Sequence, residues 1–238
     1  MPTPVVPTGL PLVDGLSGLA RPTIQDYCQA AAQYISAAST VGSDRSKAAQ
    51  IRLSKALAVV TVADLRATGL TLANAVAGET EVGGGLRAVK ADVSEISAAD
   101  GLKLAVEIKP VHLAIGRAIW NRFGDVRTFA VNIDLKFPFA VVGGILTLPT
   151  SERMRSGDDT QWRSTEHLVG RAVGRFTRAG GRRTEGDAPH LLEGIAVVAF
   201  DRETGAVDAG LPPTASGIRW ADFIATMAEA YDARFGEI

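Results

Sequence analysis

Residues 86–110 read LRAVKADVSEISAADGLKLAVEIKP and alternate apolar with polar side chains, which predicts a β-hairpin. The apolar positions of its second strand are Leu102, Leu104, Val106 and Ile108. Glu107 and Lys109 therefore fall together on the opposite, polar face of that strand. Asp92 takes the polar face of the first strand. The hairpin thus predicts one face that carries Asp92, Glu107 and Lys109.

The register of this hairpin depends on the length of its turn. A four-residue turn over 98–101 would place Asp92 opposite Glu107, and a two-residue turn at Asp100 and Gly101 would place it opposite Lys109. Both registers keep the three groups on one side. A three-residue turn would move Asp92 to the other face, so the prediction requires an even turn.

Two acids and a lysine on one strand face fit the hydrolysis of a phosphodiester. This reaction uses a hard cation that neutralises the phosphate and activates a bound water, and carboxylates are the ligands of such cations. Asp92 and Glu107 would hold the cation, while Lys109 would stabilise negative charge or help to deprotonate the water. The competing interpretation is the solvent-exposed face of an edge hairpin. The apolar residues around Glu107 instead favour an interior position, where unpaired carboxylates are rare.

Asp92 followed by Glu107-Ile108-Lys109 on the next strand resembles the motif of the PD-(D/E)xK nuclease superfamily, in particular type II restriction endonucleases. The proline of the motif is absent, because Ala91 precedes Asp92. The resemblance implies that Asp92, Glu107 and the Ile108 carbonyl bind Mg²⁺. It also implies that Lys109 is the catalytic lysine.

The resemblance further implies an α/β fold with a restriction-endonuclease-like core, in which a central mixed β-sheet is flanked by helices. Residues 54–77 would supply the helix before the hairpin, 113–131 the helix after it, and 139–149 a further buried strand. The implied activity is Mg²⁺-dependent cleavage of double-stranded DNA by a type II restriction endonuclease. The alternatives are a junction-resolving or repair nuclease, and a catalytically silent DNA-binding protein with the same fold. The intact acids and lysine argue against the silent protein.

Three other acids compete for a role in this site. Asp100 is the rival first acid, because an Ala-Asp pair also precedes Glu107 there, but it falls in the turn. Glu79 and Glu81 are candidates for a further carboxylate. Both lie in a glycine-rich stretch, for which a loop is the simpler interpretation.

The rest of the chain predicts one domain behind an extended arm. Residues 1–22 contain five prolines and are expected to form that arm, followed by a single nuclease domain over 23–238. The domain should begin with a helical N-terminal third: a helix from Thr23 to about Ser39, and two more over 44–62 and 62–77 that divide near Asp64. A buried strand over 191–200 and a helix over about 218–235 are expected near the end.

A run of arginines is the second candidate binding feature. Residues 163–183 contain six arginines and one acid. Four of them recur at three- and four-residue spacing and would line one helix face as phosphate contacts: Arg171, Arg175, Arg178 and Arg182. The simpler interpretation is a solvated helix face.

Composition gives weaker constraints. The chain has 238 residues, 46% of them hydrophobic, and a formal net charge of −1, so overall charge does not indicate nucleic-acid binding. A single cysteine, Cys28, rules out an internal disulfide. No apolar stretch is long enough to cross a bilayer, and we expect a cytoplasmic protein. A homodimer is expected, because two-fold symmetry suits the cutting of both strands of a palindromic site.

Overall fold

The computed structural model describes residues 10–38, 43–153 and 162–236. Its helices and strands are, in chain order, α1 (Pro11–Gly15), η1 (Leu16–Gly18), α2 (Ile24–Ala37), α3 (Ser43–Ala67), β1 (Val76–Gly83), β2 (Ala88–Ser97), β3 (Gly101–Pro110), α4 (Ile115–Asp134), β4 (Val141–Pro149), β5 (Ser151–Arg153), β6 (Trp162–Ser164), α5 (Glu166–Phe176), η2 (Thr177–Ala179), β7 (Gly194–Phe200), η3 (Thr214–Ser216) and α6 (Trp220–Phe235).

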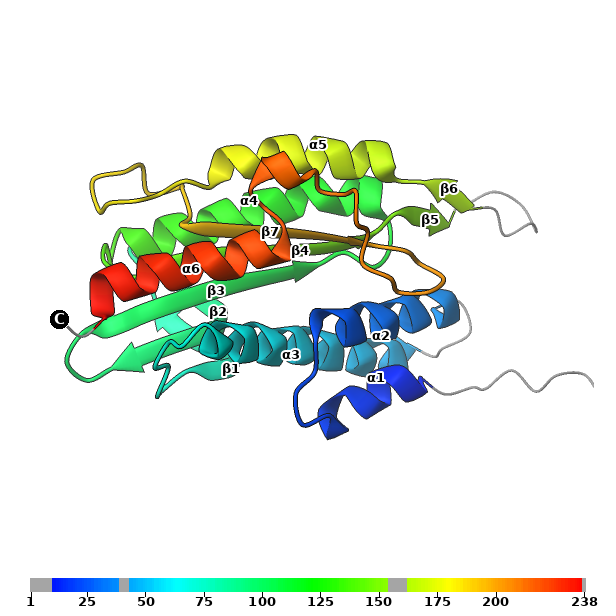
Figure 1. Ribbon diagram of the computed structural model, residues 1–238, viewed down its shortest axis with the longest axis horizontal. Coiled ribbons are helices and arrows are strands. Elements are labelled where there is room, and N and C mark those ends of the chain that lie inside the picture. Colours follow the sequence, from blue (N-terminus) through cyan, green and yellow to red (C-terminus); the bar gives the residue numbers. More distant parts are fainter. Residues whose placement is uncertain (1–9, 39–42, 154–161, 237–238) are drawn as a thin grey trace, which may run out of the picture.

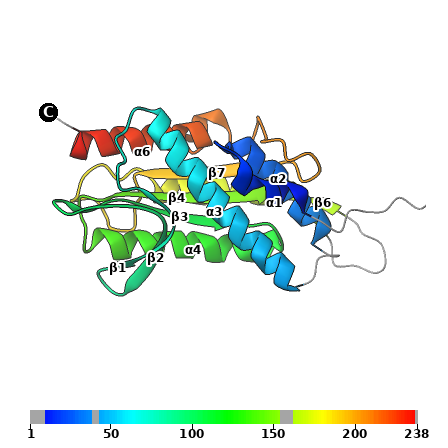
Figure 2. The ribbon, with the colours of Figure 1, turned by 90° about the horizontal axis from the view of Figure 1, so that it is seen from below.

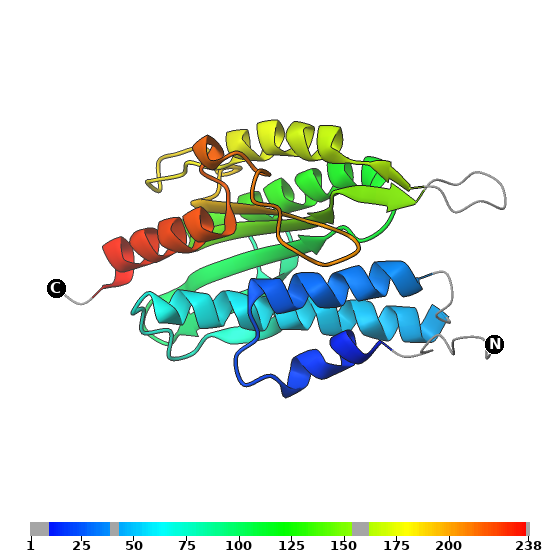
Figure 3. The same ribbon diagram turned by 45° about the vertical axis from the view of Figure 1, so that its right-hand side comes forward.

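The core is a five-stranded mixed sheet in the order β1-β2-β3-β4-β7, as the predicted α/β class requires. β1, β2 and β3 are antiparallel neighbours, whereas β3, β4 and β7 run parallel. The two parallel connections pass through α4 and α5, which cover the same face of the sheet (Figure 1). The N-terminal helices and α6 cover the other face (Figure 3). The central strands are therefore buried on both sides.

β4 carries two adjacent glycines because helices approach it closely from both faces. A Cβ at Gly143 would lie 2.9 Å from Met227 and Phe223 of α6, and one at Gly144 would lie 2.6 Å from Val126 of α4. The pairing of β4 runs without a register shift through both glycines. The glycine pair therefore marks a close approach of two helices to the strand and is not a β-bulge.

The β2–β3 hairpin forms as predicted but has a different turn. Ser97 pairs with Gly101, so the turn has three residues, the length that would move Asp92 to the wrong face. A β-bulge around Lys103 places one extra residue on β3 and reverses that change. The requirement for an even turn was therefore wrong, because the bulge corrects the register.

Beyond the bulge, the hairpin has the first of the two predicted registers. Val93 pairs with Val106 as the last pair of the ladder, and Asp92 and Glu107 are the next residues on the two strands. Glu107 shares the face of β3 that carries Ala105, and this face points toward α4.

The N-terminal segment corrects the predicted arm. Residues 1–9 lie outside the described part of the chain, but 11–18 form α1 and η1 rather than part of an extended arm. Leu10, Val13 and Leu16 recur every three residues and are buried against α2 and α3. Pro11 occupies the first turn of α1, where a proline favours helix initiation.

The prediction of two helices over 44–62 and 62–77, divided near Asp64, is also wrong. α3 is continuous to Ala67, and Asp64 lies on its surface, where it accepts hydrogen bonds from Arg21 and Trp220. The helix ends because Gly69 adopts a left-handed conformation with φ of 99°. The chain then enters β1, which the glycine-rich sequence had not indicated as a strand. α2, by contrast, begins as predicted, with Thr23 as its N-terminal cap.

The glycines after β1 allow the β1–β2 connection to rest on α4. The Gly85 amide donates to the Asn132 carbonyl at 2.7 Å, and a Cβ at Gly85 would lie 2.5 Å from Leu135. The buried Asn132 side chain accepts from the amide of Arg87 at 3.0 Å. This contact holds the outer two strands against the end of α4.

None of the helices in the described residues is long and apolar enough to cross a membrane.

Candidate functional site

Asp92 is joined directly to the strand that carries the other two predicted residues. Its carboxylate Oδ2 accepts a hydrogen bond from the backbone amide of Ile108 at 2.7 Å. The ladder between β2 and β3 begins at Val93, so the Asp92 side chain supplies the acceptor that a neighbouring strand would provide. Within a strand, the amide and carbonyl of one residue point to the same edge, so the Ile108 carbonyl also faces Asp92.

Glu107 lies beside Asp92 and is almost fully buried. The residue is only 7% exposed, and its carboxylate forms an ion pair with the Nζ atom of Lys109. Both side chains lie on the α4 side of β3, and Asp125 of α4 is close enough to affect Glu107. Asp92, Glu107, Ile108 and Lys109 are thus brought together, as the sequence predicted.

The two carboxyl groups are held in a setting that favours their protonated forms. Burial raises the pKa of Glu107 to about 7, against the opposing effect of Lys109, and the nearby charge of Asp92 raises it further. Burial also raises the pKa of Asp92, while the Ile108 amide and Lys109 act in the opposite direction. A cation bound between the two acids would offset the cost of ionising both carboxyl groups. This arrangement therefore suits a cation-binding site.

A cleft of about 810 Å³ lies beside these residues, although Glu107 is not part of its lining. The first half of α3 forms one wall of the cleft, and β1 together with the start of α4 forms the others. Figure 2 shows α3 passing in front of the sheet. Asp92, Ile108 and Lys109 line the cleft at the carboxyl end of β3. In open α/β sheets, ligands bind at this end of the strands.

The donor set fits a magnesium ion, although it is small. In the described ranges, no group of three or more His, Cys, Asp or Glu side chains is placed to hold a metal. Mg²⁺ commonly uses one or two carboxylates and completes its octahedron with water and substrate phosphate. Asp92 and Glu107 supply the two carboxylates, and the Ile108 carbonyl is an additional oxygen donor beside them.

The competing acids are sorted by position. Asp100 lies in the turn at the far end of β3, where its carboxylate accepts a hydrogen bond from the Ser97 hydroxyl at 2.9 Å. Seven residues of strand separate it from Glu107, a distance of about 23 Å. Glu79 does line the cleft, but on β1 and paired with Lys90 at 2.8 Å. Glu81 pairs with β2 and does not line it.

The four arginines predicted to line one helix face do not share one surface: three are exposed and Arg182 is buried. Arg171, Arg175 and Arg178 are exposed on α5 and η2, and the first two stack on Trp120 at 5.1 and 4.0 Å from the ring centre. Their contact with DNA stays a prediction. None of these arginines lines the cleft.

Arg182 does not lie on the exposed helix face with the other three arginines. The side chain is buried, with Nη1 at 2.8 Å from Glu193 and 3.3 Å from Asp134. Helical structure ends at Ala179, and Gly181 turns the chain inward with φ of 97°. The prediction that Arg182 contacts phosphate was therefore wrong, because the glycine pair breaks the helical spacing on which it rested.

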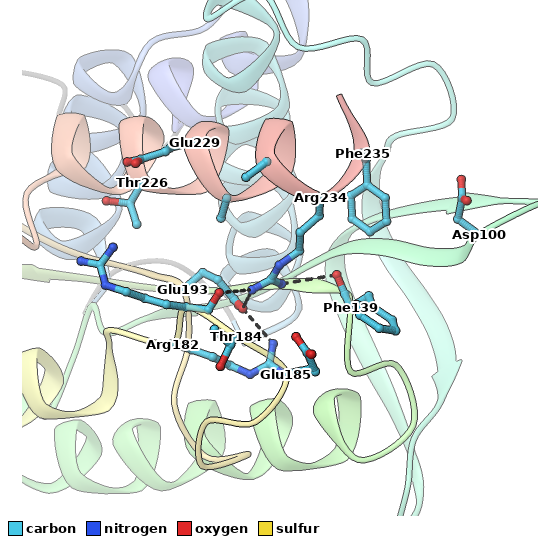
Figure 4. Close-up of a pocket in the computed structure, with 13 residues that line it drawn as sticks. Asp100, Phe139, Arg182, Thr184, Glu185, Glu193, Thr226, Glu229, Arg234 and Phe235 are labelled. Atoms are coloured by element: carbon cyan, nitrogen blue, oxygen red, sulfur yellow. Dashed lines mark hydrogen bonds and ion pairs between the residues drawn. The ribbon is translucent and has the colours of Figure 1, made fainter. Parts of the chain in front are cut away.

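Arg182 belongs to an ionic cluster at the opposite end of the sheet. Arg234 of α6 also reaches Glu193, at 2.6 Å, beside a second pocket of about 730 Å³ (Figure 4). Burial raises the pKa of Asp134 to about 8, against the effect of Arg182. The cluster joins α4, β7 and α6 and contains none of the predicted catalytic residues.

Two features of the cleft were missed from the sequence. The first is a buried network behind the end of β3, in which the Tyr27 hydroxyl lies 3.1 Å from His112 Nε2 and 2.8 Å from Thr147 Oγ1. Burial lowers the pKa of His112 to about 4, so this imidazole is neutral near pH 7. The second is the pair Lys47 and Lys55 on α3. Their helical spacing was visible, but nothing in the sequence showed which structure that face of α3 would meet.

Comparisons with protein-family models, with curated proteins and with solved structures find no match for this chain.

Proposed function

We propose that this protein is a Mg²⁺-dependent nuclease of the PD-(D/E)xK type that hydrolyses phosphodiester bonds in DNA. The observation that carries the proposal is the hydrogen bond from the Ile108 amide to Asp92, which fixes this carboxylate beside Glu107 and Lys109 at the opening of a cleft. The order of helix, antiparallel hairpin, crossover helix and parallel strand agrees with the restriction-endonuclease-like core.

Asp92, Glu107 and the Ile108 carbonyl would hold the magnesium ion in this proposal. When bound, the ion supplies Lewis-acid stabilisation of the phosphate and lowers the pKa of the attacking water. The protein keeps both carboxylates rigid: Asp92 through the Ile108 amide, and Glu107 through burial and its ion pair. Fixed ligands of this kind avoid reorganisation during the reaction.

Lys109 would act on the negative charge that forms at the phosphate. Its Nζ atom contacts Glu107 and the side chain remains partly exposed in the cleft, where it can reach a bound phosphate or the attacking water. The Tyr27–His112–Thr147 network packs beneath the chain that leaves β3 and holds it in place. Lys109 lies three residues before His112 on the segment that this network anchors.

Within this activity, we favour a type II restriction endonuclease that cuts double-stranded DNA as a homodimer. The alternatives are a junction-resolving or repair nuclease and a catalytically silent DNA-binding protein. Incubation of the protein with unmethylated phage DNA and Mg²⁺ separates them. Discrete bands on a gel support restriction, a smear supports a nuclease without site preference, and uncut DNA supports the silent protein.

The catalytic assignment is tested with alanine variants in the same assay. Asp92→Ala and Glu107→Ala should each lower the cleavage rate by at least about a thousandfold, because the cation supplies several kcal/mol of transition-state stabilisation. Lys109→Ala should also lose most activity. DNA binding in Ca²⁺ should persist in all three variants.

Asp100→Ala is the matched control, since it removes an acid from the same hairpin outside the cleft. It should cut at nearly the wild-type rate. An inactive Asp100→Ala protein together with an active Asp92→Ala protein would show that the first acid is misassigned.

A further inference from the structure

Four cations in the first half of α3 fall into two groups with different surroundings. Arg45 and Arg52 face α1, where both reach Asp14, at 3.7 and 2.6 Å. Lys47 and Lys55 face the cleft, are exposed, and have no ion-pair partner among the described residues. The two arginines thus share one acid, Asp14, whereas the two lysines on the cleft side have no acidic partner in the described part of the chain.

The lining of the cleft has more cationic than acidic side chains, whereas the whole chain has a formal net charge of −1. Its described lining contains four cationic side chains, Lys47, Lys55, Lys109 and Arg122, and two acidic ones, Glu79 and Asp92. Glu79 is paired with Lys90, outside this lining. Lys109 is paired with Glu107 and Arg122 with Asp125, so the unpaired charges of this described lining are Lys47, Lys55 and Asp92.

We propose that the cleft-facing side of α3 binds the sugar-phosphate backbone of the DNA strand that is cut. We call this surface the α3 lysine face: Lys47 and Lys55, with Gln50 and Ser54 between them. The inference rests on the proposed nuclease function and adds where the substrate is held.

The geometry of the α3 lysine face suits a nucleic-acid strand. Eight residues of helix separate Lys47 from Lys55, a rise of about 12 Å, and the intervening positions keep both on one side. One DNA strand carries a charge about every 3.4 Å of duplex axis, so the two lysines reach different phosphates. The face is rigid because α3 runs unbroken from Ser43 to Ala67.

The opposite wall supplies a partner for this face. Arg122 of α4 lines the cleft and holds Asp125 at 2.9 Å with its side chain nearly half exposed. A strand bound along both walls would run past Asp92 and Lys109, which line the same cleft. The arginines of α5 lie outside this path.

The test is the salt dependence of binding to a short fluorescein-labelled DNA duplex, measured by anisotropy with the full chain in Ca²⁺. Each of Lys47→Ala and Lys55→Ala should weaken binding and reduce the slope of log affinity against log salt by about 0.9, and the double variant by about twice that. Arg52→Ala is the matched control: it removes a cation of the same helix that pairs with Asp14 instead. It should keep the wild-type slope.

The outcomes separate this inference from the proposed function. If the double variant keeps the wild-type slope, or if Arg52→Ala reduces it equally, the α3 lysine face is refuted, whatever the protein cleaves. If binding depends on Lys47 and Lys55 but Mg²⁺ produces no cleavage, the inference holds and the nuclease chemistry fails. A protein that does not bind the duplex at all refutes both. Thermal unfolding should be the same for all variants, because these side chains are exposed.

Discussion

At the scale of single residues, the bond between Asp92 and the Ile108 amide matters most. A carboxylate in this place replaces a backbone acceptor at the point where β2 and β3 separate. The strand ladder and the candidate site therefore depend on the same side chain. The neighbouring Glu107 is buried and contacts Lys109. Burial raises the pKa of this carboxyl, so we expect metal binding and stability to depend on pH.

We expect the apparent affinity for Mg²⁺ to rise with pH and to level off above about 7. The pKa of Glu107 is raised to about 7 by burial, and a proton on this carboxyl competes with the cation. Calorimetric titration of Mg²⁺ on both sides of that pH measures the effect. An affinity that does not change with pH would mean that Glu107 is not a ligand.

The same shift has a consequence for the stability of the metal-free protein. The pKa of Glu107 is higher in the folded state than the ordinary value of 4.5, so the folded state retains a proton that the unfolded chain releases. The contribution of this group to stability is present below pH 4.5 and is lost as pH rises to about 7. Glu107→Gln should remove both this loss and the pH dependence of Mg²⁺ binding. Urea unfolding of the wild type and of Glu107→Gln at several pH values measures this difference.

At the scale of elements, the hairpin and the glycines of β4 set the geometry of the site. The extra residue at Lys103 makes Leu102 and Leu104 pack on opposite faces of the sheet, although strict alternation assigned them to one. Gly144 lies beside Glu107 in the ladder and lets α4 approach the sheet at that point.

Gly144→Ala should therefore lower the free energy of unfolding by about 1–3 kcal/mol, the usual cost of overpacking a core. The new Cβ would meet Val126 at 2.6 Å. Gly170→Ala is the matched control, since Gly170 lies in α5 with open space around it. It should raise stability by about 0.5–1 kcal/mol, because alanine is the better helix former. Urea denaturation of both variants checks the opposite signs.

At the scale of the whole molecule, the two ends of the sheet differ in character. The cleft and its free cations lie at the carboxyl end of β3, whereas the cluster of Arg182, Glu193, Asp134 and Arg234 joins the elements at the other end. The second cluster contains buried charges paired with one another. It fixes the mutual positions of α4, β7 and α6, while the first end presents unpaired charge to a ligand.

We expect the protein to form a homodimer when it cuts both strands of a symmetric site. The described residues of one chain contain one candidate set of Asp92, Glu107 and Lys109, and a two-fold pair matches the symmetry of the DNA. Sedimentation of the protein alone and with a cleaved duplex in Ca²⁺ measures the state. A monomer under both conditions would favour a nicking or repair role.

The sequence by itself determined the local features. The period of two over 86–110 identified the hairpin, and the apolar runs identified β4 and β7. Thr23 marked the start of α2. These patterns depend on neighbours within a few residues, and strand alternation and helix capping act over that range.

Tertiary structure decided what depends on contacts between distant segments. β1 is a strand because β2 pairs with it, and residues 11–18 are helical because α2 and α3 bury Leu10, Val13 and Leu16. Arg182 is internal because Glu193 and Asp134 meet it there. Lys47 and Lys55 of α3 could be recognised as part of the candidate site only from the fold, which places them in the same cleft as Asp92. Each of these outcomes is set by burial and charge pairing between parts of the chain that are far apart in sequence, and no local pattern encodes that proximity.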